Sequence, residues 1–123
     1  MRNHIKVLGA YGGKNIGTNT TSILINEDSV IDAGNILNSL GNDAFKINNI
    51  FLTHSHMDHI CDIPFLIDAF FEKRETPILV YALKDVIKHL QDHIFNWKIW
   101  PNFCEIKLQN GKNAIEFIEV KIG

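Results

Sequence analysis

Apolar residues in this chain recur in short stretches separated by polar turns, a pattern typical of β-strands. Asn26-Glu27-Asp28 lies between two of these stretches and predicts a hairpin turn. A final strand pair is expected around Asn110-Gly111, at residues 105–108 and 114–122. The other expected strands lie at residues 4–8, 21–26, 29–33, 49–53 and 78–81.

Two further segments have apolar residues at the spacing of an amphipathic helix. In the first, Asp68 and Glu72 mark the polar face, and the apolar face comprises Ile63, Leu66, Ile67, Phe70 and Phe71. The apolar face of the second comprises Leu83, Val86, Ile87, Leu90 and Ile94. Because strands and helices mix without strict βα alternation, the pattern favours a layered α/β sandwich over a doubly wound parallel sheet.

Composition limits the class of protein. The 123 residues make one domain at most, and a hydrophobic content of 46% is enough for a core. A net charge of −2 without a basic run argues against nucleic-acid binding. Cys61 and Cys104 are too few for the disulfide framework of a small secreted protein. Because no stretch is apolar enough for a signal peptide or a membrane span, we expect a cytoplasmic protein without a membrane partner.

The run Thr53-His54-Ser55-His56-Met57-Asp58-His59 concentrates metal-ligand residues directly after the apolar stretch Ile50-Phe51-Leu52. Side chains two apart in an extended segment point the same way, so His54 and His56 can reach one metal ion. If a helix begins near residue 60, the adjacent Asp58 and His59 can turn toward a second ion. Imidazole and carboxylate ligands suit zinc, manganese or iron better than calcium or magnesium. The alternative is a polar loop with surface histidines.

The His-x-His-x-Asp-His order after an apolar strand resembles the metallo-β-lactamase superfamily. The segment from His93 to Phe103, which contains Asn96-Trp97-Lys98-Ile99-Trp100-Pro101-Asn102, is similar to the class II 3′,5′-cyclic-nucleotide phosphodiesterases. So is the opening, where Val7-Leu8-Gly9 precedes a Gly12-Gly13 turn and then Thr18-Asn19-Thr20-Thr21-Ser22. The resemblance covers nearly the whole chain. It implies the first half of an αββα sandwich, with a mixed sheet and flanking helices.

The resemblance also implies an activity. In that family two divalent metal ions, most often zinc, activate a water that cleaves the cyclic phosphodiester of cAMP or cGMP to the 5′-monophosphate. By position, His54 and His56 are assigned to the first ion, and Asp58 and His59 to the second. Asp58 is also assigned a role in handling a proton. The expected partner is therefore a small cyclic nucleotide rather than a nucleic acid.

Two more aspartates are candidates for roles near this motif. The resemblance assigns Asp32, at the end of an early strand, to support of the histidine loop from behind. A turn aspartate before Gly34 is the equally weighted alternative. Asp62 stands where the family has a small residue. We expect it to be the N-cap of the helix that begins at Ile63-Pro64, with an extra outer metal ligand as the alternative.

The resemblance also implies ligands that this chain lacks. In the superfamily a second half supplies further histidines and a bridging aspartate, and this chain stops at Lys121-Ile122-Gly123 before such a segment. Residues 1–123 are therefore expected to form a single, incomplete domain. Its uncovered apolar face favours self-association or a complementing chain, and activity of the chain alone is an open question.

Two other functions remain open at this stage. A tRNA 3′-end nuclease belongs to the same superfamily, although such an enzyme is expected to carry Lys and Arg clusters for RNA. The third possibility is an inactive, truncated fragment that binds metal.

Two aromatic residues and one polar helix face complete the candidates. Trp97 and Trp100 are candidates for stacking against the base of a nucleotide, although anchoring a loop to the core is the commoner role. Asp85, His89 and His93 share one face of the second predicted helix. A solvated face is preferred there over a metal site.

The glycine-rich turn from Gly9 to Lys14 suggests a phosphate-binding loop, but its spacing fails the Walker pattern. A flexible turn beside the pocket is the preferred interpretation.

Overall fold

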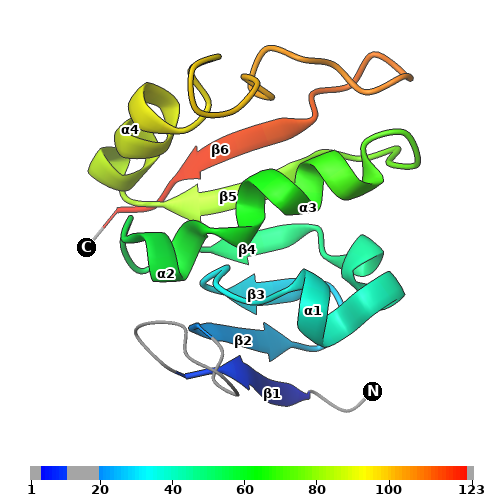
Figure 1. The fold of residues 1–123 in the computed structure, drawn as a ribbon, viewed down its shortest axis with the longest axis vertical. Helices are drawn as coiled ribbons and strands as arrows, with labels where there is room; N and C mark the ends of the chain where they lie inside the picture. The colour runs from blue at the N-terminus through cyan, green and yellow to red at the C-terminus, as the bar shows by residue number, and fades with distance from the viewer. Residues whose placement is uncertain (1–3, 11–19, 122–123) are drawn as a thin grey trace.

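The computed structural model describes residues 4–10 and 20–121, whose strands form one six-stranded sheet in the order β1-β2-β3-β4-β5-β6 (Figure 1). Pairing is antiparallel between β1, β2 and β3, and parallel between β3, β4, β5 and β6. The expected mixed sheet is therefore confirmed. The strands are β1 Ile5–Gly9, β2 Ser22–Ile25, β3 Ser29–Ile31, β4 Asn49–Phe51, β5 Ile78–Ala82 and β6 Ile115–Glu119.

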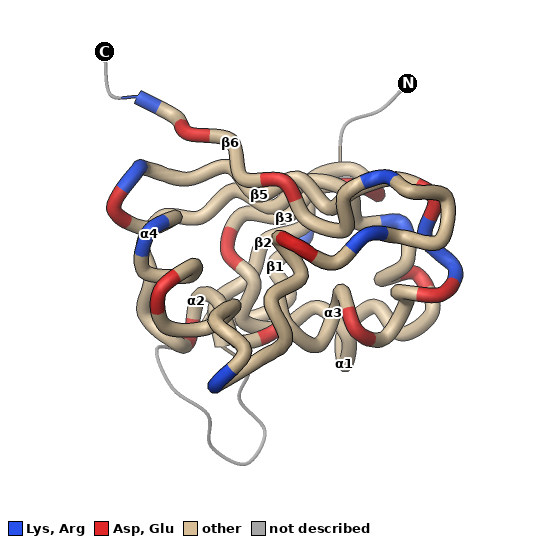
Figure 2. The backbone as a smooth tube through the Cα atoms, turned by 90° about the horizontal axis from the view of Figure 1, so that it is seen from above, with Lys and Arg blue, Asp and Glu red and all other residues tan. Residues whose placement is uncertain are grey.

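Helices of the described segments cover one face of this sheet. They lie in front of the strands in Figure 1, and the view from above in Figure 2 places α1, α2 and α3 on the same side. None of these helices is long and apolar enough to cross a membrane. Their bounds are α1 Leu37–Leu40, the 3-10 helix η1 Gly41–Lys46, α2 Met57–Ile60, α3 Asp62–Phe70 and α4 Lys84–His93.

The core lies between the sheet and these helices. Val30, Ile50 and Val80 occupy neighbouring positions on β3, β4 and β5 and are fully buried. Because side chains alternate along a strand, these residues share the face that meets the helices. Ile63 and Leu66 of α3 are fully buried in the same core cluster, whereas Phe70 at the end of the helix is partly buried. The amphipathic pattern of this segment therefore predicted its packing.

The opposite face of the sheet is apolar, and we call it the open face. Ile5, Val7 and Phe51 are 75%, 60% and 40% exposed on it. The rings of Phe51 and Tyr81 stack on adjacent strands with centroids 4.5 Å apart. Within residues 4–10 and 20–121 no helix covers this face. Strand register places these apolar residues on the open face: Ile5, Val7, Ile23, Ile25, Ile31, Phe51, Leu79, Tyr81 and Ile118.

One predicted strand is wrong. Residues 105–108 form no strand, and Lys107 makes only an isolated bridge to Asn113 across the turn at Gly111. The next segment pairs instead with β5 along its five residues, which satisfies more backbone groups than a short hairpin would. The predicted Asn26-to-Asp28 turn is confirmed. Residues 11–14 of the glycine-rich turn and the Thr18-Asn19 pair lie outside the described residues.

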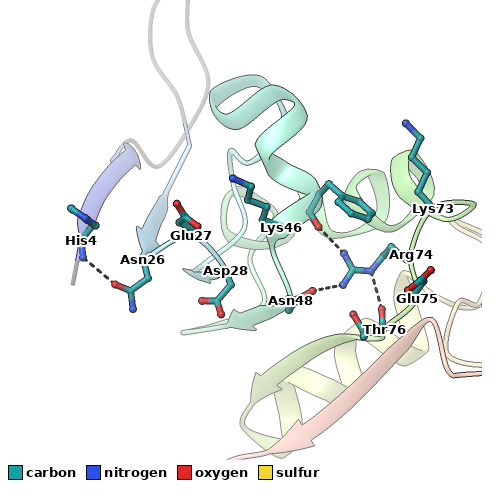
Figure 3. Close-up of a pocket in the computed structure, with 11 residues that line it drawn as sticks. His4, Asn26, Glu27, Asp28, Lys46, Asn48, Lys73, Arg74, Glu75 and Thr76 are labelled. Carbon is teal, nitrogen blue, oxygen red and sulfur yellow. Dashed lines mark hydrogen bonds between the residues drawn. The ribbon is translucent and has the colours of Figure 1, made fainter. Parts of the chain in front are cut away.

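Arg74 links the loop before β4 to the loop before β5, at the end of the sheet where the parallel strands begin. It is buried, and its guanidinium donates to the carbonyl of Thr76 at 3.0 Å and to the Asn48 side chain at 2.7 Å (Figure 3). It also donates to the carbonyl of Ile47 at 3.1 Å. Longer contacts reach two more carbonyls, those of Phe45 and Pro77. Burial lowers the pKa of Arg74 to about 10. Neutral acceptors thus hold this cation in place.

Candidate metal centre

The histidine motif occupies the turn between β4 and α2. His56 has an extended backbone with ψ of 148°, and α2 begins at the next residue, so Asp58 lies in the first helical turn. Ligand atoms of His54, His56 and Asp58 all lie within 4.8 Å of one another. The rings of His54 and His56 have centroids 4.8 Å apart. These three side chains therefore converge on one point, as the spacing of the motif predicted for the two histidines.

His59 lies against this cluster and contacts both Asp58 and His54. Its Nε2 is 3.1 Å from Oδ2 of Asp58, and its ring centroid is 3.8 Å from that of His54. Its Nδ1 is 2.8 Å from Oδ2 of Asp32. When a carboxylate accepts a hydrogen bond from one ring nitrogen of a histidine, the other ring nitrogen carries no proton and can bind a metal ion. The motif thus forms one continuous group in which Asp58 is central.

Asp32 is buried behind the histidine loop. Its carboxylate accepts hydrogen bonds from the Thr53 backbone N–H at 2.9 Å and from the Thr53 hydroxyl at 2.8 Å. The φ of Asp32 is 61°, in the left-handed region that aspartate tolerates better than most residues. Asp32 thus combines a left-handed turn backbone with a carboxylate that faces the histidine loop, and its role in supporting that loop stays a prediction. Thr53 was not among the sequence candidates, although it begins the motif.

The residues after Asp32 bring the chain close to α2. The Ala33 N–H donates to the carbonyl of His59 at 2.6 Å. A Cβ at Gly34 would overlap the carbonyl oxygen of Asp58 and lie 2.6 Å from that of Thr21. Only glycine leaves room for this approach. The position of Asp58 therefore depends on a glycine that the sequence analysis treated only as part of a turn.

Asp62 makes a contact that the sequence analysis did not foresee. It is the first residue of α3 and makes no side-chain cap of its own helix. Its Oδ2 instead accepts the backbone N–H groups of Ile36 and Leu37 at 2.6 and 3.0 Å. The carboxylate thereby satisfies donors at the start of α1, which has no side-chain cap of its own. The predicted cap of α3 is wrong, and the carboxylate is directed at α1.

The polar face of α4 lies near the motif at one position. Asp85, His89 and His93 are exposed, as the preferred interpretation of that face expected. Nδ1 of His89, however, is 3.0 Å from the hydroxyl oxygen of Ser55, which stands between His54 and His56. Sequence reasoning missed this contact because the residues are 34 positions apart.

The two tryptophans differ in environment. Trp100 is half-buried, and its ring meets that of Phe65 edge-on with centroids 5.1 Å apart. Trp97 is 61% exposed and has a φ of 70°. Asn96 stabilises the turn between them, because its side-chain oxygen accepts the N–H groups of Lys98 and Ile99. Trp100 thus anchors the loop, and Trp97 is the one presented to solvent.

A cavity of about 950 Å³ lies elsewhere in the molecule. Asp28, Asn48 and Thr76 line it, and these residues precede β3, β4 and β5 (Figure 3). The histidine motif follows β4, so the two features lie at opposite ends of the parallel strands. Ligands of such sheets bind beyond the carboxyl ends of the strands. The motif, rather than this cavity, occupies the expected place of an active site.

The donor set of the motif fits a divalent transition metal. Two imidazoles and a carboxylate that converge on one point are the ligands that zinc, manganese and iron accept. The fourth residue, His59, directs its Nε2 at the carboxylate of Asp58.

Comparisons with known proteins identify the family of the chain. Residues 15–123 match the family described as cAMP phosphodiesterases class-II. A probable 3′,5′-cyclic-nucleotide phosphodiesterase of Yersinia pestis is 29% identical over 130 aligned positions, which cover 82% of this chain and 36% of that protein. A shorter match joins the chain to a ribonuclease Z of Methanococcus maripaludis, 38% identical over 47 residues, covering 37% of this chain and 15% of that protein.

Solved structures share the fold. Unliganded yeast PDE1 superimposes with a TM-score of 0.81 at 15% identity, covering 97% of this chain and 50% of that one. The metallo-β-lactamase fold protein YhfI of Bacillus subtilis has a TM-score of 0.72 at 23% identity, covering 98% of this chain and 47% of that one. The metallo-β-lactamase-like fold is therefore confirmed. The chain spans about a third of the Yersinia relative, at 36%, and half of the yeast structure.

Proposed function

Because this chain belongs to the class II cAMP phosphodiesterase family, we propose that it provides a metal-dependent site for hydrolysis of cyclic nucleotides. The proposed reaction cleaves the cyclic phosphodiester of cAMP or cGMP to the 5′-monophosphate. The observation that carries the proposal is the convergence of the ligand atoms of His54, His56 and Asp58 within 4.8 Å.

We assign two divalent ions to this group, zinc first, with manganese or iron as alternatives. His54 and His56 would hold one ion, and Asp58 and His59 the other. The distance of 3.1 Å between Oδ2 of Asp58 and Nε2 of His59 supports this assignment, since it brings the two proposed ligands of the second ion together. When bound, such ions lower the pKa of a water and polarise the phosphodiester.

Asp58 is the proposed proton carrier. Water adds at phosphorus while the bond from phosphorus to the 3′ oxygen breaks, so a proton must move from the water to that oxygen. Asp58 is partly exposed at the centre of the group, where a carboxylate can accept the proton and release it. Asp32 and Thr53 keep the motif oriented while this happens.

Trp97 is the proposed contact for the base of the nucleotide. Its ring is 61% exposed, so its face is available for stacking. Trp100 shares the loop but packs on Phe65, and its proposed contribution is to hold Trp97 in place.

A second layer completes the site in this proposal. The open face is too apolar to remain in water, since Ile5, Val7 and Phe51 are exposed on it. Self-association or a complementing chain would cover that face and add the ligands that the motif lacks. Residues 1–123 are then one part of a larger domain.

Cleavage of a tRNA precursor is the competing activity, and the short ribonuclease Z match favours it over part of the chain. Charge argues against it, because the basic positions are interspersed with acidic ones (Figure 2). An inactive, metal-binding fragment is the remaining alternative.

The deciding experiment offers cAMP, cGMP and a tRNA precursor to the purified chain supplemented with zinc or manganese. We expect cyclic-nucleotide hydrolysis that falls to background in His56→Ala and persists in His93→Ala, which alters an exposed histidine of α4. Cleavage of the tRNA precursor alone would favour the nuclease. Folded, metal-loaded chain that leaves every substrate intact would identify an inactive fragment.

A further inference from the structure

A side-chain contact ties the motif loop to helix α4. Oγ of Ser55 lies 3.0 Å from Nδ1 of His89. Figure 1 shows α4 and α2 at the same end of the sheet, beyond the carboxyl ends of the parallel strands. A residue between two proposed ligands is thus bonded to an element that contributes no ligand.

The position of Ser55 between His54 and His56 lets this contact influence both histidines. Side chains of neighbouring residues in an extended segment point to opposite sides. The rings of His54 and His56 lie together on one side, with centroids 4.8 Å apart. Ser55 therefore points away from them, and a bond at its hydroxyl restricts rotation of the whole segment. Restricting that rotation fixes the direction of both imidazoles.

Helix α4 is a firm base for such a contact. Val86 and Leu90, which flank His89 in sequence, are buried in the core. The next histidine on the same face, His93, has its ring centroid 6.3 Å from that of His89 and is exposed near the end of the helix. His93 is therefore a matched control of the same residue type.

We propose that His89 is a positioning residue, which holds His54 and His56 in the conformation that binds metal by acting through Ser55. This inference rests on the proposed metal site. His89 acts at one remove and contacts neither the substrate nor the metal. Partners that orient ligands in this way change metal affinity by about 10-fold to 100-fold when removed.

The first test needs no metal. Amide ¹H–¹⁵N spectra of the metal-free chain are compared for the wild type, His89→Ala, Ser55→Ala, the double variant and His93→Ala. We expect the signals of His54 and His56 to shift alike in both single variants and no further in the double variant. His89→Asn, which places a polar atom near the former Nδ1, should restore them. Unchanged signals in His89→Ala, or equal changes in His93→Ala, would overturn the proposal.

The second test measures zinc affinity by competition with a chelator. The expected result is an affinity about 10-fold lower for His89→Ala and Ser55→Ala, with recovery in His89→Asn and no loss in His93→Ala. Equal affinity of His89→Ala and the wild type would overturn the positioning role. If the wild type binds no zinc, the metal site itself fails, and the spectra of the metal-free chain still decide whether His89 orders the loop.

Discussion

Nδ1 of His59 lies 2.8 Å from Oδ2 of Asp32, so the end of β3 and the first turn of α2 meet at the histidine cluster. The same contact turns Nε2 of His59 toward Asp58, at 3.1 Å. The buried carboxylate of Asp32 thus orients the ring of His59, a proposed ligand that lies far from it in sequence.

Replacing Asp32 with asparagine should disturb this orientation while preserving the shape of the side chain. The new side-chain NH₂ would donate to Nδ1 of His59, so the ring proton would move to Nε2. Nε2 would then have no lone pair left for a metal ion. We expect zinc affinity to fall about 10-fold to 100-fold. The ¹⁵N shifts of His59 should report the other tautomer. Asp28→Asn, an exposed aspartate, is the control, and equal affinity in both variants would contradict this role.

Gly34→Ala should displace Asp58. The new Cβ would overlap the Asp58 carbonyl and lie 2.8 Å from the Thr20 hydroxyl, so we expect a loss of about 1–3 kcal/mol in the free energy of unfolding together with weaker zinc binding. Gly41→Ala is a useful comparison, because that site has a φ of 54° but nothing within 4 Å. It should lose stability through backbone strain and retain zinc affinity. Retained affinity in Gly34→Ala would contradict the account.

Arg74→Lys should destabilise the chain although it keeps the charge. Lysine cannot match the planar guanidinium, so several carbonyls around Arg74 lose their donors. The expected loss is about 2–3 kcal/mol in the free energy of unfolding, measured with urea. Lys73→Ala, at the exposed neighbouring position, should change it by no more than about 0.5 kcal/mol. Equal urea midpoints of unfolding for the two variants would show that the hydrogen bonds of Arg74 do not stabilise the fold.

Cys104 should make stability depend on pH above neutrality. Burial, with a smaller contribution from the charge of Glu105, raises the pKa of the Cys104 thiol from 9.0 to about 11. Between these values the folded chain keeps a proton that the unfolded chain loses, so the free energy of unfolding decreases as pH rises. This contribution is fully present below pH 9. Cys104→Ser should reduce the slope between pH 9 and 11, and an identical slope in both proteins would contradict the shift.

Local pattern was sufficient for much of the fold. The buried stretch ending at Leu52 placed the histidine motif at a strand end, and the apolar spacing from Ile63 to Phe70 predicted α3. The turn at Asn110-Gly111 also forms, but the sequence around it cannot reveal that β5 has a free edge. Pairing with that edge gives β6 a longer partner than residues 105–108 offer.

The contacts between distant segments were beyond the sequence. Helix α1 has no cap of its own and depends on Asp62, 26 positions from Ile36, so its local sequence gave little sign of a helix. His89 likewise meets Ser55 only because the strand order brings α4 beside the motif. The ligand candidates followed from residue type and spacing. The groups that orient them follow from packing across the sheet.

The most direct test of the central claim is binding of cobalt(II) by the purified chain, followed by its visible absorption. The wild type should develop the bands of cobalt held by nitrogen and oxygen ligands. His56→Ala should lose them, since His54 and Asp58 alone cannot complete the group that converges within 4.8 Å. Equal spectra in the two proteins would contradict a metal centre at this motif.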